Sequence, residues 1–258
     1  MQLIVTRPLA QAEPWVARLQ ALGCSAQALP LIGIAPPRDL APVQAAWRQL
    51  AQQALVMFVS ANAVEHFFGA RPTGATWPAG VLAGSTGPGT SGALRAAGVP
   101  ADCLVQPPAD APRFDSEALW ALLQDRDWAG REAMIVRGEE GRDWLADTLR
   151  VRGAQVAFVA AYRRLPPQPD PGQQALLAAA LAQPAEHVWL FSSSEAVANL
   201  QALHAQADWS RSRALASHPR IAQAAREAGF AEVVIVSPTP EAVAHWLASG
   251  PRLQSAPQ

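Results

Sequence analysis

Two clusters of small polar side chains follow apolar, strand-like runs and have the chemistry to hold an anion. Ser60 and Asn62 follow one run, and Ser192, Ser193 and Ser194 follow another. In an open parallel sheet, ligands meet the carboxyl ends of the strands and the amino termini of the helices that come next. Hydroxyl groups and exposed helix N–H groups at such a place can bind a negative charge. A helix cap explains any single serine equally well, but the recurrence of the cluster favours a binding site.

Arginines occupy equivalent strand ends. Thr6 and Arg7 close the first apolar run of the chain, and Arg137 and Gly138 close a similar run later, with Arg142 in the turn that follows. A guanidinium group can bind a carboxylate through two parallel hydrogen bonds. Each arginine alone could be a solvated surface charge. Their shared placement at strand ends instead indicates a site for carboxylates.

Two further strand-to-helix turns have a composition typical of an anion-binding site. They are Gly87-Pro88-Gly89-Thr90 and His218-Pro219-Arg220. The glycines of the first turn do not form a dinucleotide fingerprint, because no acidic residue stands at a suitable place beyond them. We therefore expect these turns to bind an acidic group rather than a nucleotide cofactor.

Tyr162 is the only tyrosine in the chain and lies on an extended, proline-ended segment. If its phenol faces the ligand, it can donate a hydrogen bond or a proton; the alternative is an aromatic ring that packs at a strand end. No HxH, HExxH or CxxC pattern is present, so we expect no bound metal. All 20 basic residues are arginines, which excludes a lysine Schiff base and a lysine-bearing phosphate loop.

The elements that hold these residues occur twice along the chain. The run from Leu3 to Arg7 matches 134–138, and 58–64 returns as 191–197, at an offset of about 130 residues. Strand-like runs alternate with helical ones in both copies, which predicts parallel sheets with right-handed crossovers. A period of this length indicates two similar α/β domains rather than a solenoid.

Two extended segments bounded by prolines, 30–37 and 162–169, interrupt the alternation. If they lie side by side, the chain crosses once from the first domain to the second and once back. The first domain would then be 1–36 plus 167–258, and the second 38–165. We predict two flavodoxin-like parallel-sheet domains joined by a two-stranded hinge, with a ligand cleft between them.

The bulk composition excludes several classes of partner. The net charge of −1 gives no overall field to attract nucleic acid or a membrane surface. No apolar run is long enough to span a membrane, and the amino terminus has a strand pattern instead of a signal peptide. Cys24 and Cys103 are isolated and fit reduced thiols. We therefore expect a cytoplasmic protein, acting as a monomer on a small molecule.

Taken in order, the motifs resemble those of the uroporphyrinogen-III synthase family. The matching segments are Val5-Thr6-Arg7-Pro8, Phe58-Val59-Ser60-Ala61-Asn62-Ala63-Val64, Gly87-Pro88-Gly89-Thr90, Asp115-Ser116-Glu117-Ala118-Leu119, Arg137-Gly138-Glu139-Glu140-Gly141-Arg142, Tyr162-Arg163-Arg164, Phe191-Ser192-Ser193-Ser194 and His218-Pro219-Arg220-Ile221-Ala222. They span most of the chain in the order that the family has. Val59 is a departure, since the family often has Thr there; Ser192 keeps the hydroxyl in the second copy.

The resemblance implies a linear tetrapyrrole, hydroxymethylbilane, as the substrate of a lyase of haem biosynthesis. Ring closure with loss of water and inversion of the terminal pyrrole would give uroporphyrinogen III, without a cofactor. Tyr162 would assist departure of the hydroxyl and Thr90 would position the substrate, while the other strand-end residues would bind its acetate and propionate groups. The alternative is a two-lobed binding protein, without catalysis, for a small carboxylated or sugar ligand.

Overall fold

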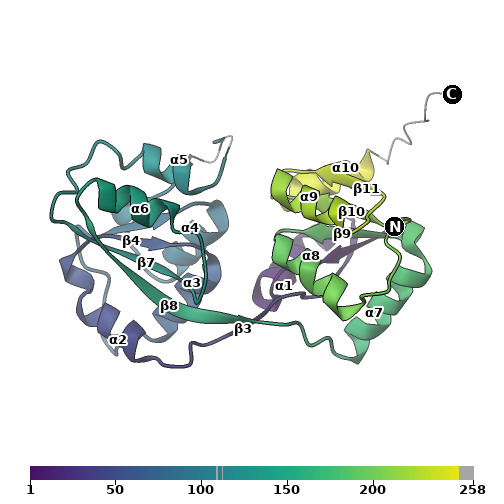
Figure 1. Cartoon of the computed structure of the whole chain (residues 1–258), viewed down its shortest axis with the longest axis horizontal. Helices are drawn as coiled ribbons and strands as arrows, with labels where there is room; N and C mark the ends of the chain where they lie inside the picture. The colour runs from purple at the N-terminus through teal and green to yellow at the C-terminus, as the bar shows by residue number, and fades with distance from the viewer. Residues whose placement is uncertain (109, 112, 250–258) are drawn as a thin grey trace. The chain divides into compact units, whose positions relative to one another are not determined.

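A computed structural model describes residues 1–108, 110–111 and 113–249 (Figure 1). The chain forms two compact units. Unit 1 consists of Met1–Gly33 and Leu165–Gln258, and unit 2 of Ile34–Arg164. Each unit is an α/β structure built on a parallel sheet, which confirms the predicted fold class. The described part of the chain has no helix that is both long and apolar enough to cross a membrane.

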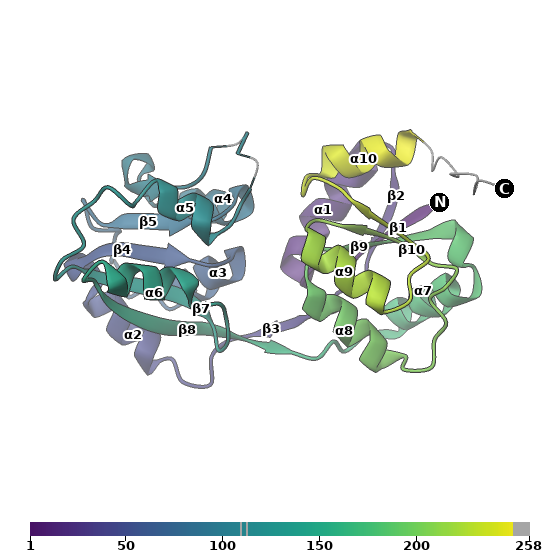
Figure 2. The same cartoon turned by 45° about the horizontal axis from the view of Figure 1, so that its top comes forward.

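Unit 1 contains a five-stranded sheet with the order β11-β10-β9-β1-β2, and all of its neighbouring strands are parallel (Figure 2). The strands are β1 (Gln2–Val5), β2 (Ser25–Ala28), β9 (His187–Phe191), β10 (Arg213–Ala216) and β11 (Glu232–Ile235). The helices are α1 (Leu9–Ala21), α7 (Pro171–Ala182), α8 (Ser194–Leu203), α9 (Pro219–Glu227) and α10 (Pro240–Ala248), with a 3-10 turn at Pro184–Glu186.

The central strand β9 of unit 1 is buried along its whole length, as expected for a parallel strand covered on both faces. Val188 and Leu190 belong to a core cluster that also contains side chains of α1 and α10. Trp189 alternates with them and therefore points to the opposite face. There its ring meets Trp209 edge-on, with the ring centroids 5.6 Å apart. The alternation of β9 thus packs α1 and α10 against one face of the sheet and the ring of Trp209 against the other.

Unit 2 contains a six-stranded sheet with the order β3-β8-β7-β4-β5-β6. The strands are β3 (Gly33–Ala35), β4 (Gln53–Phe58), β5 (Leu82–Ser85), β6 (Leu104–Val105), β7 (Glu132–Gly138) and β8 (Gln155–Leu165). The helices are α2 (Ala41–Arg48), α3 (Ala61–Gly69), α4 (Pro88–Ala96), α5 (Ser116–Ala121) and α6 (Trp144–Val151), with 3-10 turns at Leu50–Gln52 and Ala101–Cys103. One core cluster includes side chains of α3 and α4, and a second includes side chains of α5 and α6.

The two proline-bounded segments each contribute residues to a pair of neighbouring strands. Gly33 begins β3, which lies beside β8 at the edge of the second sheet. A Cβ atom on Gly33 would lie 3.1 Å from the Cβ of Leu165, so glycine permits this close approach. β8 continues to Leu165, which makes Tyr162 part of a strand. The domain limits expected at 36/38 and 165/167, and the cleft between the domains, stay predictions.

Candidate functional site

Three predicted site residues meet at the carboxyl edge of the unit 2 sheet. Ser60 follows β4 and caps α3, where its Oγ accepts a hydrogen bond from the backbone N–H of Ala63 at 3.2 Å. The same hydroxyl donates to the phenol oxygen of Tyr162 at 3.2 Å. Gly138 ends β7 and pairs with Tyr162 in the sheet. Residues far apart in the sequence therefore form one hydrogen-bonded group.

An irregular pairing in the sheet determines the position of Tyr162. Arg137 lies opposite Ala160, whereas Gly138 lies opposite Tyr162, so β8 contains one extra residue at this point. Such a bulge breaks the alternation of side chains along a strand. Ala161 and Tyr162 consequently both join the core cluster that includes α3.

The phenol of Tyr162 is buried, with 1% of the residue exposed, as in the alternative of an aromatic ring that packs at a strand end. A Cβ on Gly138 would lie 3.2 Å from two carbons of the phenol ring, so glycine makes room for it. Strict alternation from Val159 would have placed Tyr162 on the other face, and a bulge cannot be read from the local pattern. The phenol oxygen is the atom of the Tyr162 side chain that meets Ser60 at the edge of the sheet.

The adjoining helix termini in unit 2 present further polar groups. Thr90 and Asn62 lie in the first turns of α4 and α3, and both are buried. Gly89 has no heavy atom within 4 Å of a Cβ built on it, which leaves open space beside the turn. Ser85 ends β5 with 1% exposure, and its hydroxyl has no hydrogen-bond partner among the described residues. Ser85 was missed by the sequence analysis, although a polar residue that ends an apolar strand was available as a signal.

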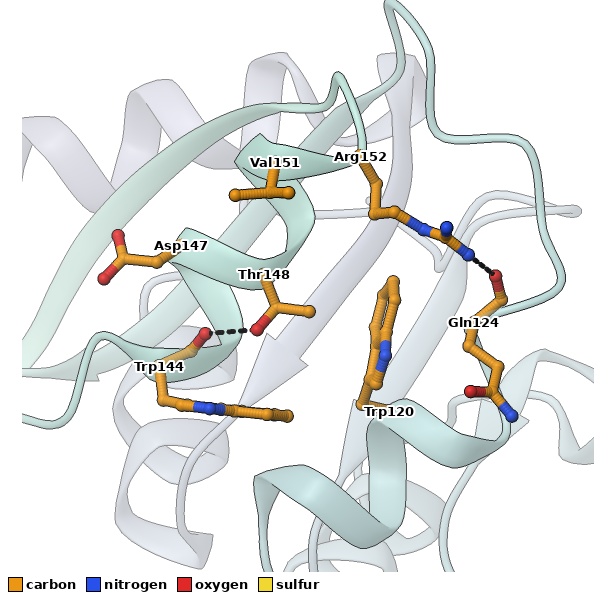
Figure 3. A pocket seen from close by; sticks show the side chains of 7 residues that line it. All are labelled: Trp120, Gln124, Trp144, Asp147, Thr148, Val151 and Arg152. Atoms are coloured by element: carbon orange, nitrogen blue, oxygen red, sulfur yellow. Dashed lines mark hydrogen bonds between the residues drawn. The ribbon is translucent and has the colours of Figure 1, made fainter.

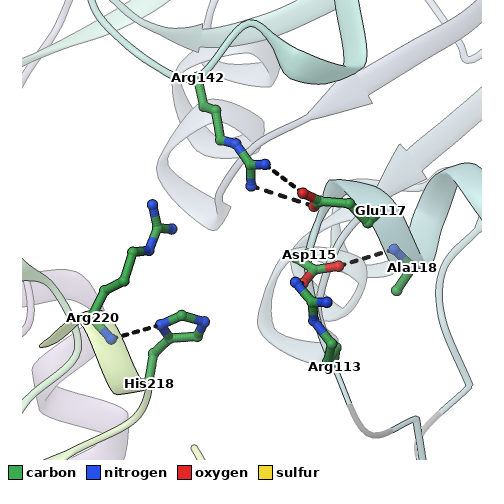
Figure 4. A network of polar contacts seen from close by, with 7 residues as sticks. All are labelled: Arg113, Asp115, Glu117, Ala118, Arg142, His218 and Arg220. Carbon is green, nitrogen blue, oxygen red and sulfur yellow. Dashed lines mark hydrogen bonds and ion pairs between the residues drawn. The ribbon is translucent and has the colours of Figure 1, made fainter. Parts of the chain in front are cut away.

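Both predicted arginines of unit 2 are engaged at this edge. The guanidinium group of Arg137 stacks over the ring of Phe158, 3.8 Å from its centroid, and forms an ion pair with Asp143. Arg142 forms an ion pair with Glu117 (Figure 4). The structure thus brings both arginines to the predicted edge, but each already has a carboxylate partner.

In unit 1, the predicted site residues Thr6 and Arg7 differ in their hydrogen bonding. Thr6 is buried, and its hydroxyl donates to the carbonyl oxygen of Leu190 at 2.7 Å, which ties β1 to β9. Arg7 stacks over Trp15, with Cζ 4.3 Å from the ring centroid. Its Nε atom is shielded from solvent and has no hydrogen-bond partner in the described part of the chain. Burial lowers the pKa of Arg7 from its ordinary value to about 10, so the group stays charged at neutral pH.

The remaining predicted residues of unit 1 are gathered at the amino termini of α8 and α9. Ser193 caps α8 by accepting a hydrogen bond from the backbone of Glu195, and Ser192 precedes it, half-buried. His218 caps α9 through Nδ1, which accepts from the backbone N–H of Arg220 at 3.1 Å. The capping explanation therefore holds for Ser193 and His218.

The two capped helices of unit 1 touch. The hydroxyl of Ser194 donates to the carbonyl oxygen of Arg220 at 3.5 Å, and Pro219 is the first residue of α9. Because β1, β9 and β10 are neighbours in one parallel sheet, the turns that follow them lie at the same edge as Arg7. The predicted residues thus form two sets, one at the carboxyl edge of each sheet.

A groove on unit 2 lies apart from these residues. It has a volume of about 470 Å³ and runs between α5 and α6 (Figure 3). Its lining consists of Trp120, Gln124, Trp144, Asp147, Thr148, Val151 and Arg152. None of the predicted site residues contributes to it, so the site is assigned from the polar strand ends. The described residues also contain no group of three or more His, Cys, Asp or Glu side chains that could hold a metal ion.

The chain is similar in sequence to known proteins of one family. The family model described as "Uroporphyrinogen-III synthase HemD" matches residues 13–245. The uroporphyrinogen-III synthase of Salmonella typhimurium is 33% identical over 177 residues, which are 68% of this chain and 70% of that protein. The Escherichia coli protein of the same name is 31% identical over 177 residues, with the same shares of 68% and 70%.

Solved structures share the fold. A mutant uroporphyrinogen III synthase from Thermus thermophilus has a TM-score of 0.59 and 21% identity, covering 96% of this chain and 98% of that chain. The enzyme from Helicobacter pylori has a TM-score of 0.56 and 17% identity, with coverage of 96% and 99%. These identities are low, so the two structures support the architecture and not the roles of individual residues.

Proposed function

Because the chain belongs to the uroporphyrinogen-III synthase family, we propose that its two polar edges bind the carboxylate groups of hydroxymethylbilane. The activity is that of a cyclising lyase of porphyrin and haem biosynthesis. It closes the linear tetrapyrrole to uroporphyrinogen III, with loss of water and inversion of the terminal ring.

The gathering of guanidinium groups, hydroxyls and helix amino termini at strand ends is the observation that supports this role. Hydroxymethylbilane has negatively charged acetate and propionate groups along its whole length. Helix amino termini favour negative charge, so they can bind these groups. An electron-rich pyrrole expels the hydroxyl readily, so the enzyme mainly has to set which carbon of the last ring attacks. Enforced orientation of this kind can contribute several kcal/mol to lowering the barrier. We assign carboxylate binding to Arg7, Arg220, Arg137 and Arg142.

We assign loss of the hydroxyl to the pair formed by Tyr162 and Ser60. The phenol is buried, so it would act on the substrate through the Ser60 hydroxyl, which meets it at 3.2 Å. Hydroxyl hydrogens rotate, and a serine oxygen can accept two hydrogen bonds while it donates one. Tyr162 would donate to Ser60, and Ser60 to the departing hydroxyl. Thr90 would position the substrate from the first turn of α4.

Tyr162→Phe and Ser60→Ala are each expected to lower kcat roughly tenfold, because either change breaks the same donor chain. The double variant is expected to lose no more than the single variants. Single-turnover rates of the four proteins measure this coupling. Rate losses that multiply in the double variant would show that the two hydroxyls act separately.

The activity itself is tested by product analysis. Freshly prepared hydroxymethylbilane is supplied, the products are oxidised, and the isomers are separated by chromatography. We expect the inverted isomer III in excess over the symmetric isomer that forms without protein. Only the symmetric isomer, at the uncatalysed rate, would reject the function. Binding of hydroxymethylbilane without turnover would instead favour the alternative of a non-catalytic binding protein.

Four further features belong to the same proposal. The ring closure moves no electrons to an acceptor, so we infer that it needs no cofactor. We also infer a cytoplasmic monomer without a nucleic-acid partner, in keeping with the net charge of −1. Light scattering coupled to size exclusion should give a mass near 27.3 kDa.

A further inference from the structure

The ion pair of Arg142 with Glu117 has the geometry of a bound substrate carboxylate. Both terminal guanidinium nitrogens of Arg142 face the carboxylate: Nη1 lies 3.3 Å from Oε2 of Glu117, and Nη2 makes a shorter contact with Oε1 (Figure 4). Two parallel hydrogen bonds of this kind are how an arginine recognises a carboxylate ligand. Glu117 is thus a carboxylate of the chain itself that binds the guanidinium group of Arg142, which we assign to binding a carboxylate of the substrate.

The same arrangement recurs among the arginines near this edge of unit 2. Arg137 is paired with Asp143, and Arg113 lies 2.7 Å from Asp115. Unit 1 differs. Neither Arg7 nor the side chain of Arg220 has a carboxylate partner among the described residues. Among the predicted site arginines in the described part of the chain, those of unit 2 are therefore paired with an internal acid and those of unit 1 are not.

Glu117 does not cap the helix on which it stands. α5 is capped by Asp115, whose carboxylate accepts a hydrogen bond from the backbone N–H of Ala118 at 2.9 Å. The Glu117 side chain is 30% exposed and that of Arg142 is 49% exposed, so solvent and a ligand can reach the pair. An exposed ion pair is weak and can be opened by a competing anion.

We propose that Glu117 is an affinity-determining residue, because it occupies Arg142 and must be displaced by a carboxylate of the substrate. The inference rests on the proposed function. For a ligand with many carboxylates, each arginine adds to the binding free energy, and an internal competitor at Arg142 keeps substrate and product from binding too tightly. Glu117 does not touch the reacting atoms, so its effect is expected on KM.

The test is the Glu117→Gln variant, which removes the charge and keeps the size of the side chain. Its KM for hydroxymethylbilane is expected to fall about two- to fivefold, which is the range that an exposed ion pair is worth. Arg142→Gln should raise KM. The matched control is Asp147→Asn, which breaks an exposed pair with Arg150 on α6 (3.1 Å) and should leave KM unchanged.

The combination of Glu117→Gln with Arg142→Gln identifies the cause. If Glu117 acts by competing for Arg142, its removal has no effect once Arg142 is gone. A fall in KM that persists in this background would show general charge repulsion and overturn the proposal. A rise in KM for Glu117→Gln alone would show that Glu117 holds Arg142 in place for the substrate. An unchanged KM would show that Glu117 does not compete with the substrate. Either result would also overturn the proposal. Formation of isomer III by the wild-type protein in the same assay keeps this test separate from that of the function.

Discussion

Replacing Arg7 with Met is expected to make the protein more stable and a poorer enzyme. Burial lowers the pKa of Arg7 to about 10, and a shift of this size corresponds to a cost of about 3 kcal/mol for keeping the charge. Stacking on Trp15 offsets roughly 1–2 kcal/mol of that cost. The methionine variant should therefore gain about 1–2 kcal/mol in the free energy of unfolding, measured by urea denaturation at pH 7.

The activity of the Arg7→Met variant should change in the opposite direction. A hydrogen bond to a charged group contributes about 1.5–3 kcal/mol, so kcat/KM should fall roughly ten- to hundredfold. Arg18→Met is the matched control, because Arg18 lies on α1, the helix that follows Arg7, and pairs with Glu241 in solvent. It should change kcat/KM little. An Arg7→Met protein that is less stable and fully active would show that Arg7 has a structural role.

The pH dependence of stability gives an independent check on Arg7. Its folded-state pKa lies below the unfolded one, so above about pH 10 the unfolded chain binds the proton more strongly than the folded one. The cost of the buried charge is present at neutral pH and is relieved as the pH rises through about 10. The stability advantage of Arg7→Met should accordingly shrink above that pH. A constant advantage would show that desolvation of the charge is not its cause.

Gly138→Val should give the second large effect. A Cβ at this position would lie 3.2 Å from the phenol ring of Tyr162, so the ring must move or the strands must separate. Overpacking of a core typically costs about 1–3 kcal/mol, and displacement of a catalytic group by about 1 Å can lower kcat roughly hundredfold. Thermal unfolding and steady-state kinetics measure the two effects.

A matched glycine separates this effect from a general sensitivity to substitution. Gly92 lies in α4, and no heavy atom is within 4 Å of a Cβ built on it. Gly92→Ala should therefore keep full activity and gain up to about 1 kcal/mol from higher helix propensity. Adding Tyr162→Leu to Gly138→Val should recover stability, because it makes room, without recovering turnover. Normal kcat in Gly138→Val would show that the position of the phenol is unimportant.

The sequence by itself determined the architecture and the family. Apolar runs that alternate with helices dictate parallel sheets, and the repeat of these runs dictates two similar units, because these patterns reflect local periodicity and burial. The same reasoning placed Arg7, Ser60 and Ser193 at strand ends, where the structure has them. The family resemblance, carried by the ordered motifs, was confirmed by the match over 13–245.

The tertiary structure alone decided how those residues are used. The bulge opposite Gly138 turned Tyr162 into the core, and the hydroxyl of Thr6 was taken up by the carbonyl of Leu190. Glu117 met Arg142 across 25 residues of sequence. Each of these outcomes depends on pairing between distant segments. Local patterns fix which face a side chain prefers, but only the assembled sheet fixes which partner it finds there.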